Sequence, residues 1–367
     1  MKLDRIEVSG FKSIRELKLD LHSLNVLIGA NGSGKSNFIE LFEVLNNVVA
    51  GNFQLFVARK GGAESFLYYG QKSTEKIQIR LDFGLNAYSC TWVPTANDTM
   101  VFAKERYDYY EEGSSHPLSY FMASAGHKES RLPEDAKSLP SKMKSDVLDN
   151  LKSWKVYHFH DTSESAPVKK SRDINDNLYL RSDAGNLAAF LYLLSRTKKE
   201  HYEAIRDTIR LVTPFFDDFF LRPNPENENM IRLEWREKRS DFPFQAYHLS
   251  DGTLRFICLA TLLLQPELPS TILIDEPELG LHPYAIVVLA SLMRSAAERT
   301  QLIVSTQSVS LVNQFDAEDL LVVERKEHDH RYETVIGRID TEKLDAWLEE
   351  YSLGELWEKN VLGGRPQ

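Results

Sequence analysis

The chain has 367 residues, a formal net charge of −10 and two cysteines, Cys90 and Cys258. An acidic balance argues against a protein that coats nucleic acid unselectively, and two cysteines give no disulfide framework. The longest apolar run, residues 256–264, is too short to span a bilayer, and the N-terminus lacks the apolar segment of a signal peptide. We therefore expect a cytoplasmic protein that does not enter a membrane.

Two short segments near the N-terminus have the alternating pattern of half-buried strands. Residues 3–8 and 17–21 alternate apolar and polar side chains, which predicts two edge strands. The apolar run 24–28 follows and predicts a buried strand. A helical pattern begins at Asn37 and ends near Gly51.

Between that strand and that helix stands a phosphate-binding loop, G-x-x-x-x-G-K-[ST]. Its glycines allow the backbone N–H groups to face a polyphosphate, Lys35 reaches the β- and γ-phosphates, and Ser36 supplies a hydroxyl to Mg²⁺. The bound anion also lies at a helix N-terminus. The alternative is a glycine-rich turn that binds nothing, but the flanking strand and helix favour the loop. The predicted cofactor-binding residues here are Gly29, Ala30, Asn31, Gly32, Ser33, Gly34, Lys35 and Ser36.

The middle of the chain is less informative. Period-two patterns between 76 and 107 predict antiparallel strands in a smaller sheet beside the nucleotide core. Residues 108–150 are polar and contain three prolines, which predicts loops with short helices. An apolar strand at 156–159 carries His158 and His160 on one side, a spacing that metals use, although no third ligand clusters nearby.

Basic residues gather in two later segments. Residues 163–177 lack periodicity and predict a mobile basic loop. Two amphipathic helices follow at 185–196 and 199–212, and their basic side includes Lys198, Lys199 and Arg206. Such a side is either a solvated face or a nucleic-acid groove.

Three motifs in the last third of the chain bear on nucleotide chemistry. The strand 270–274 ends in Asp275 and Glu276, which either hold Mg²⁺ and activate water or cap the next helix. The loop Leu249-Ser250-Asp251-Gly252-Thr253 opens a helix, with Ser250 as its N-cap. The strand 301–305 leads to Gln307, at the edge where a γ-phosphate sensor lies.

The order of these motifs resembles the RecF/SMC-like branch of the ABC-type ATPases, the stand-alone predicted ATPases of the AAA-21 kind. The matching segments are FKSI at 11–14, GANGSGKS at 29–36, LSDGT at 249–253, ILIDEPELGLHP at 272–283 and VSTQS at 304–308. The resemblance implies an α/β fold: a P-loop NTPase core of the ABC type, with a mixed sheet and an antiparallel β subdomain. An inserted α+β and helical lobe stands in place of a coiled coil.

The same resemblance implies ATP and Mg²⁺ as cofactors and assigns roles to individual residues. Glu276 and Gln307 are the catalytic residues, with Glu276 as the base. Ser36, Asp275 and Gln71 are associated with the metal, Gln71 being a guess for the Q-loop. The nucleotide-binding set also includes Lys12, Ser13 and the signature loop residues Ser250, Asp251 and Gly252, which in the family contact the γ-phosphate bound by the other subunit.

The sequence departs from the family pattern at three positions. The signature reads LSDGT where many relatives have LSGGQ, His282 occupies the aspartate position of the D-loop, and Gln307 stands where many relatives have histidine. Glutamine orients water but cannot act as a proton carrier at neutral pH, so we expect slow turnover.

Four regions follow from this interpretation. Residues 1–75 and 244–340 are the two parts of the ATPase core, 76–243 form the inserted β-meander and helical lobe, and 341–367 form a C-terminal tail with an amphipathic helical pattern from 344. No segment between 52 and 248 sustains the heptads of a coiled-coil arm. The tail's aromatic residues indicate either core packing or a docking strip.

The leading hypothesis for function is an ATP-hydrolysing switch that dimerises head-to-head around two ATP molecules, with a higher oligomer also open. The family implies action on DNA, in repair or anti-phage defence, or control of a separately encoded nuclease or toxin as partner. The alternatives are an ATP-binding scaffold with little turnover and the motor subunit of a membrane transporter. The absent coupling glutamine and the mixed insertion argue against the transporter.

Overall fold

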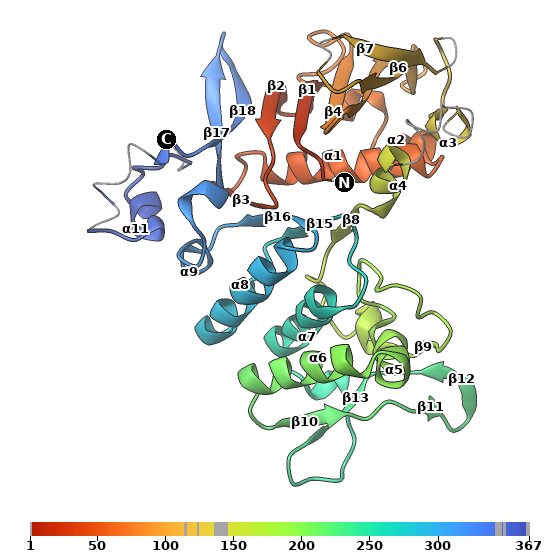
Figure 1. Cartoon of the computed structure of the whole chain (residues 1–367), viewed down its shortest axis with the longest axis vertical. Coiled ribbons are helices and arrows are strands. Elements are labelled where there is room, and N and C mark those ends of the chain that lie inside the picture. The colour runs from red at the N-terminus through yellow and green to blue at the C-terminus, as the bar shows by residue number, and fades with distance from the viewer. Residues whose placement is uncertain are drawn as a thin grey trace.

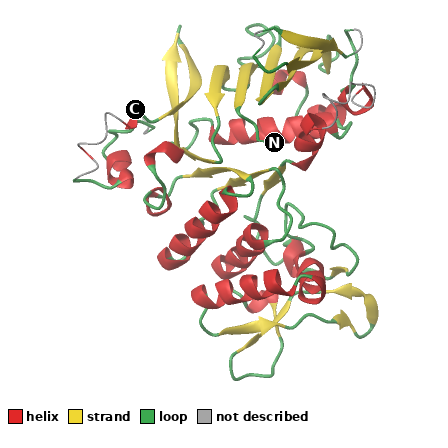
Figure 2. Ribbon diagram, in the orientation of Figure 1, coloured by secondary structure: helices red, strands yellow, loops and turns green. Residues whose placement is uncertain are grey.

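The structure, a computed structural model, describes residues 2–113, 116–122, 125–135, 146–341, 347 and 350–364. Two six-stranded sheets form the upper half of the molecule in Figure 1, and four helices with two small sheets form the lower half. Figure 2 shows the same division as yellow strands above and mostly red helices below.

The first sheet is antiparallel and contains the N-terminal strands. Its order is β2-β1-β4-β5-β6-β7. The strand bounds are β1 Arg5–Phe11, β2 Ile14–Asp20, β4 Ile77–Phe83, β5 Asn86–Pro94, β6 Met100–Tyr110 and β7 Pro117–Phe121. The predicted meander is therefore present, and it continues the sheet begun by β1 and β2.

One prediction about this sheet is wrong. Strand β1 is internal and not an edge strand, because Val8 pairs with Leu17 of β2 on one side and with Ile79 of β4 on the other. The boundary predicted between residues 75 and 76 consequently falls between two strands that share a sheet.

The second sheet is mixed and carries the motifs. Its order is β18-β17-β3-β16-β15-β8, and every neighbouring pair is parallel except the β17–β18 hairpin. The bounds are β3 Leu24–Ile28, β8 Lys155–Tyr157, β15 Thr271–Asp275, β16 Gln301–Thr306, β17 Leu320–His328 and β18 Arg331–Arg338. Strands β3 and β16 are buried throughout, as expected for parallel strands covered on both faces.

The two faces of the mixed sheet belong to different hydrophobic cores. Leu27 of β3 and Leu273 of β15 pack with helix α1 (Lys35–Val49) and the antiparallel sheet. Val26 and Ile274 pack with the helices of the lower half. Alternation along each strand thus places the mixed sheet between α1 with the antiparallel sheet on one face and the helices of the lower half on the other.

The lower half contains the helical part of the segment predicted as an insertion, together with the helices that follow the distal motifs. Its helices are α5 Leu187–Thr197, α6 Lys199–Val212, α7 Asp251–Leu264 and α8 Pro283–Ala297. The small sheets are β10-β13-β14 and β11-β12-β9. Their strands are β9 Arg172–Asp173, β10 Phe216–Phe219, β11 Pro223–Asn224, β12 Asn227–Ile231, β13 Glu234–Glu237 and β14 Phe244–Gln245. The helices predicted at 185–196 and 199–212 are confirmed.

Short elements complete the described ranges. They are α2 Phe53–Arg59, η1 Ala63–Phe66, α3 Leu132–Asp135, α4 Asp146–Ser153, η2 Pro167–Lys169, η3 Ala246–His248, α9 Val309–Val312, η4 Ala317–Asp319 and α11 Leu353–Glu358. Of the predicted C-terminal helical pattern, α11 is described, whereas residues 342–346, 348–349 and 365–367 lie outside the described residues. Among the helices that the structure describes, none is long and apolar enough to cross a membrane.

Candidate functional site

Four parallel strands end at one edge of the mixed sheet, and each delivers a motif there. Register pairs Val26 of β3 with Val304 of β16, Val304 with Ile274 of β15, and Ile274 with Tyr157 of β8. The phosphate loop, Gln307, the Asp275–Glu276 pair and the 158–160 segment therefore follow at the same edge. In parallel sheets, this carboxyl edge is where ligands bind.

The phosphate loop has the geometry that its glycines predict. Gly32 (φ 77°) and Gly34 (φ 112°) are left-handed, and helix α1 begins directly after Gly34. A Cβ on Gly34 would lie 2.1 Å from Thr334 Oγ1, so the position is closed to any other residue. A Cβ on Gly32 would meet nothing within 4 Å, which leaves the outer side of the loop open to a ligand.

Two buried polar groups in this loop fit a polyphosphate. The Lys35 side chain is 6% exposed, and its Nζ donates to the carbonyls of Gly29 (2.7 Å) and Ala30 (3.1 Å). Burial lowers the pKa of Lys35, and the charges of Glu276 and Asp275 act in the opposite direction. The buried Ser33 hydroxyl has no hydrogen-bond partner among the described residues. A buried cation and an unpaired hydroxyl beside an open glycine turn suit an incoming anion.

The two predicted acids are held by the neighbouring strand β16. The Ser305 hydroxyl donates to Asp275, and the side-chain amide of Gln307 donates to Glu276. Glu276 has φ 41°, a left-handed conformation that costs energy in a residue with a side chain, and its N–H donates to Ser305 O (2.9 Å). The sheet therefore fixes Glu276 in a strained turn and sets Gln307 directly against it.

A third acid at this edge, Glu278, was not predicted. It is 7% exposed, and its Oε1 accepts from the Thr306 hydroxyl and from the backbone N–H of Gln307 (3.4 Å). Its Oε2 is buried without a hydrogen-bond partner among the described residues, and burial raises the pKa of Glu278. The sequence signal that could have identified Glu278 is a second carboxylate two residues after Glu276. In that segment, capping of the next helix was the competing explanation for acidic residues.

We expect Glu278 to impose a pH dependence on stability. Because the pKa of Glu278 is raised in the folded state, the folded protein binds that proton more tightly, and the free energy of unfolding falls as pH rises from the ordinary value of 4.5 through the raised one. Glu278→Gln removes this slope, whereas Glu278→Ala leaves the Thr306 and Gln307 donors unpaired and costs about 1–3 kcal/mol. Urea unfolding over a window of about pH 5 to 8 measures both effects. Parallel curves for the wild type and Glu278→Gln would contradict the assignment.

The signature loop lies on the lower half of the molecule. Ser250 caps helix α7, and its Oγ accepts from the N–H of Thr253 (3.2 Å). Gly252 packs so closely on Gly280 that a Cβ would lie 2.2 Å from the Gly280 carbonyl oxygen. Ser250 and Asp251 are exposed. Among the described residues, no hydrogen bond or ion pair joins this loop to the phosphate loop of the same chain.

Of the remaining predicted residues, Ser13 is brought to the phosphate loop. Its hydroxyl accepts from Asn37 (2.6 Å) and lies 2.8 Å from the Thr334 hydroxyl, which donates to Ser33 O (2.7 Å). Lys12 has φ 48° and forms an ion pair with Glu40 of α1.

Gln71 lies elsewhere. It is exposed, its N–H donates to the Glu64 carboxylate (3.2 and 3.3 Å), and it lines a separate groove. Its role as a metal ligand stays a prediction without support from these contacts.

The two histidines after β8 share the edge with Asp275. His158 Nε2 lies 2.8 Å from Glu43 Oε1, and that hydrogen bond raises the pKa of His158. Burial lowers the pKa of His160, against the charge of Asp275. The sequence predicted the strand and the shared side but not the neighbour, since β8 and β15 are far apart in the chain. Within the part of the chain that the structure describes, no group of three or more His, Cys, Asp or Glu could hold a metal ion.

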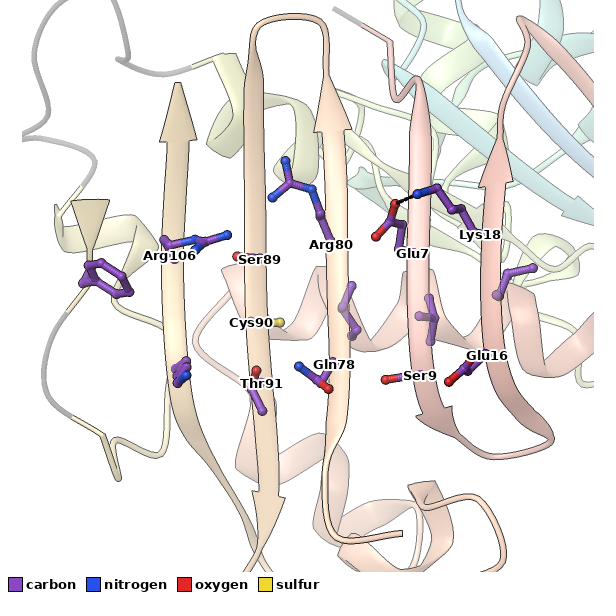
Figure 3. A pocket seen from close by; sticks show the side chains of 15 residues that line it. Glu7, Ser9, Glu16, Lys18, Gln78, Arg80, Ser89, Cys90, Thr91 and Arg106 are labelled. Atoms are coloured by element: carbon purple, nitrogen blue, oxygen red, sulfur yellow. Dashed lines mark ion pairs between the residues drawn. The ribbon is translucent and has the colours of Figure 1, made fainter. Parts of the chain in front are cut away.

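A hollow of about 760 Å³ lies on the outer face of the antiparallel sheet, away from these motifs (Figure 3). Several of its charges are already paired: Lys18 with Glu7 (2.8 Å) inside the hollow, and Arg80 (3.1 Å) and Arg106 (2.9 Å) with the buried Asp108. Such mutual neutralisation leaves little for a charged ligand, so this hollow is not our candidate site.

The C-terminal segment is hydrogen-bonded to the phosphate loop. The N–H of Ala30 donates to the carbonyl of Gly364 (2.8 Å), and the N–H of Gly364 donates to Glu324 (3.0 Å). Gly354, in α11, donates to Asn313 (2.6 Å), just after α9. Helix α9 begins two residues after Gln307, so one segment touches both the phosphate loop and the helix that follows the predicted sensor.

Comparisons with known proteins bear on the family and the fold of the chain. The chain matches the family model described as "AAA domain, putative AbiEii toxin, Type IV TA system" over residues 24–313. It is 22% identical over 385 residues to the OLD nuclease of Thermus scotoductus, covering 96% of this chain and 67% of that protein. It is 46% identical over 46 residues to the DNA replication and repair protein RecF of Lactococcus lactis, a match that spans only 13% of RecF and 12% of this chain.

Two solved structures show the fold. The SMC head bound to the C-terminal winged-helix domain of ScpA matches with a TM-score of 0.56 at 15% identity, covering 94% of this chain and 99% of that one. An SMC head with an extended coiled coil from Pyrococcus furiosus matches with a TM-score of 0.53 at 15% identity, covering 95% and 99%. The ABC-type ATPase fold implied by the motif order is confirmed.

Proposed function

Because the chain belongs to the family of AAA domains described as putative AbiEii toxins of type IV toxin–antitoxin systems, we propose that it is an ATP-hydrolysing switch of the SMC and RecF type. The observation that carries the proposal is the shared sheet edge, where the phosphate loop, Asp275, Glu276 and Gln307 follow adjacent parallel strands. The P-loop ATPase class accounts for nucleotide binding, and we assign ATP and Mg²⁺ as the cofactors.

In this proposal each residue has one task. Residues 29–36 bind the phosphates through backbone N–H groups and Lys35, while Ser36 and Asp275 hold the magnesium ion, which neutralises charge on the phosphates when bound. Glu276 accepts a proton from the attacking water. Gln307 orients Glu276 and that water through its amide, which the hydrogen bond between the two side chains supports.

The proposed switch closes when two copies meet. The exposed signature loop, Ser250 to Gly252, makes no polar contact with its own phosphate loop among the described residues, so its helix N-terminus is free to contact a phosphate held by a second copy. ATP then stabilises the dimer, or a higher oligomer, and hydrolysis releases it. We propose that the dimeric state is recognised by a partner, which is either DNA or a separately encoded nuclease or toxin. The protein then acts in the cytoplasm, in DNA repair or in defence against phage.

We expect Ser250→Arg to block ATP-dependent association while leaving ATP affinity unchanged. An arginine at this N-cap removes the Thr253 hydrogen bond and fills the space in front of the helix, but it lies outside the phosphate loop. Light scattering with and without Mg–ATP measures association, and Ser310→Arg, an exposed position on α9, is a matched control. A Ser250→Arg protein that still dimerises with ATP would contradict the assigned signature role.

The experiment that tests the function is steady-state ATP hydrolysis with and without DNA, in the wild type and in Glu276→Gln. Wild-type turnover faster than that of Glu276→Gln supports the switch. The second candidate, an ATP-binding scaffold for an effector, is favoured by Gln307, whose amide cannot accept and pass on a proton at neutral pH. The scaffold predicts ATP-dependent association together with equal, negligible turnover in the wild type and in Glu276→Gln.

A further inference from the structure

A second concave surface lies between the antiparallel sheet and the β17–β18 hairpin. It is a groove of about 740 Å³ between the 68–76 loop, the start of β2 and the tip of the hairpin. Five of its side chains are basic or imidazole groups, and several others are hydroxyl or amide donors. They are Arg15, Lys72, Lys76, His328 and Arg331, with Ser9, Gln71, Ser73 and Thr74. Two carboxylates, Glu75 and Asp329, also line the groove, so its basic groups outnumber its acids.

Three cations of this groove have no acidic partner. Among the described residues, Lys72, Lys76 and Arg331 have no carboxylate within ion-pair distance, whereas Arg15 (3.9 Å) and His328 (2.8 Å) both lie beside Asp329. Lys72, Lys76 and Arg331 are exposed. In a chain of net charge −10, a groove with three unpaired cations is a local exception that attracts an anion.

The basic side of helix α6, the nucleic-acid candidate from the sequence, differs in this respect. Arg206 forms ion pairs with Asp207 (2.9 Å) and Asp218 (3.8 Å), and Lys199 lies 3.8 Å from Glu203. Neutralised cations release fewer counterions from a nucleic acid, so this face contributes less to binding. The partner of Arg206 on β10 was not visible from helical periodicity.

Exposed tyrosines stand beside the groove. Tyr69 is 47% exposed with φ 53°, Tyr332 is 49% exposed, and the N–H of Tyr332 donates to Tyr69 Oη (2.9 Å). The Arg331 guanidinium lies 5.3 Å from the centre of the Tyr69 ring. Aromatic faces beside phosphate-binding cations are the combination on which single-stranded nucleic acid binds.

The groove is also connected to the phosphate loop by strand β18. Tyr332 follows Arg331 of the groove in β18, and Thr334, two residues along the same strand, donates to Ser33 O of the phosphate loop (2.7 Å). The N–H of Thr334 donates to Ser13 O (2.7 Å). A ligand that moves the hairpin therefore acts on the loop through a short, hydrogen-bonded segment.

We propose that this groove, defined by Arg15, Lys72, Lys76, His328 and Arg331, binds the phosphate backbone of single-stranded nucleic acid and transmits its occupancy to the phosphate loop through Thr334. The proposal rests on the ATPase switch above and identifies the surface that binds its nucleic-acid partner. The cations bind phosphates, the tyrosines stack on bases, and β18 links the two ligands.

The test uses the full chain and a fluorescein-labelled 30-nucleotide single strand, read by anisotropy at several salt concentrations. We expect Lys72→Ser, Lys76→Ser and Arg331→Ser together to raise Kd about tenfold or more and to flatten the log–log salt dependence by about two, at about 0.7 per lost contact. The matched control neutralises three cations of the α6 face, Lys198→Ser, Lys199→Ser and Arg206→Ser, and is expected to leave Kd nearly unchanged.

Each outcome decides between the two surfaces or the two ligands. Loss of binding in the α6 control alone overturns the groove. The groove proposal is also overturned if the triple groove substitution loses as much affinity for a fluorescent ATP analogue as for the strand. The substituted residues then affect nucleotide binding. A wild-type chain that hydrolyses ATP but does not bind the strand refutes the groove and leaves the ATPase. Strand binding without turnover above that of Glu276→Gln refutes the switch and leaves the groove.

Thr334→Val tests the link. It keeps the side-chain shape and removes the hydroxyl that hydrogen-bonds to Ser33 and Ser13. We expect strand affinity to stay the same and the strand's effect on ATP turnover to disappear. An unchanged effect on turnover overturns the coupling.

Discussion

Glu276→Gln is expected to lower steady-state ATP hydrolysis by about a hundredfold or more while ATP affinity is retained. The amide cannot accept a proton from water, and general-base catalysis contributes about 10²- to 10⁴-fold. The substitution is nearly isosteric, and Gln307 still has an oxygen to which its amide donates. Under the proposed switch, ATP then accumulates in the closed pair, and size-exclusion chromatography with Mg–ATP should show a lasting dimer.

The control for this experiment is Glu298→Gln, an exposed acid at the opposite end of α8 from the 272–283 motif, which is expected to change neither turnover nor association. If Glu276→Gln hydrolyses ATP at the wild-type rate, Glu276 is not the catalytic base. A Glu276→Gln protein that loses turnover but stays monomeric with ATP would preserve the base and contradict the closed pair.

Lys35→Ala is expected to weaken ATP binding by about a hundredfold. A buried ammonium that donates to phosphate contributes up to about 3 kcal/mol, which converts to that factor in Kd. Among the described residues, its Nζ donates only to the loop carbonyls of Gly29 and Ala30, so it is available to an anion. Calorimetric titration with ATP and Mg²⁺ gives the change.

Lys35→Met separates binding from folding in the same experiment. Methionine fills the space of the buried stem without the charge, so it is expected to fold and to lose ATP affinity as alanine does. Unchanged affinity in both proteins would refute the assignment of residues 29–36 as the phosphate site.

Local signals made much of the fold predictable. The strand at 24–28, the glycine loop and the helix after it form one continuous segment, and each carries its own pattern. Ser250 as the cap of α7 was likewise visible, since an N-cap interacts with residues two or three positions away. The Asp275–Glu276 pair was recognised because an apolar strand leads directly into it.

The features that sequence could not supply depend on contacts between distant segments. The sequence predicts β1 as an edge strand because its second neighbour, β4, begins far along the chain at Ile77. Strand β4 also alternates like any half-buried strand, so nothing in it identifies β1 as its partner. The role of Glu278 depends on Thr306 and Gln307, which lie on and directly after another strand. Cations on α6 looked available because Asp218, on β10, was not recognisable as their partner.

The hydrogen bond between Ala30 and Gly364 connects the last described residues of the chain directly to the phosphate loop. An environment-sensitive fluorophore attached close to Gly364 would therefore report rearrangement of the phosphate loop on nucleotide binding.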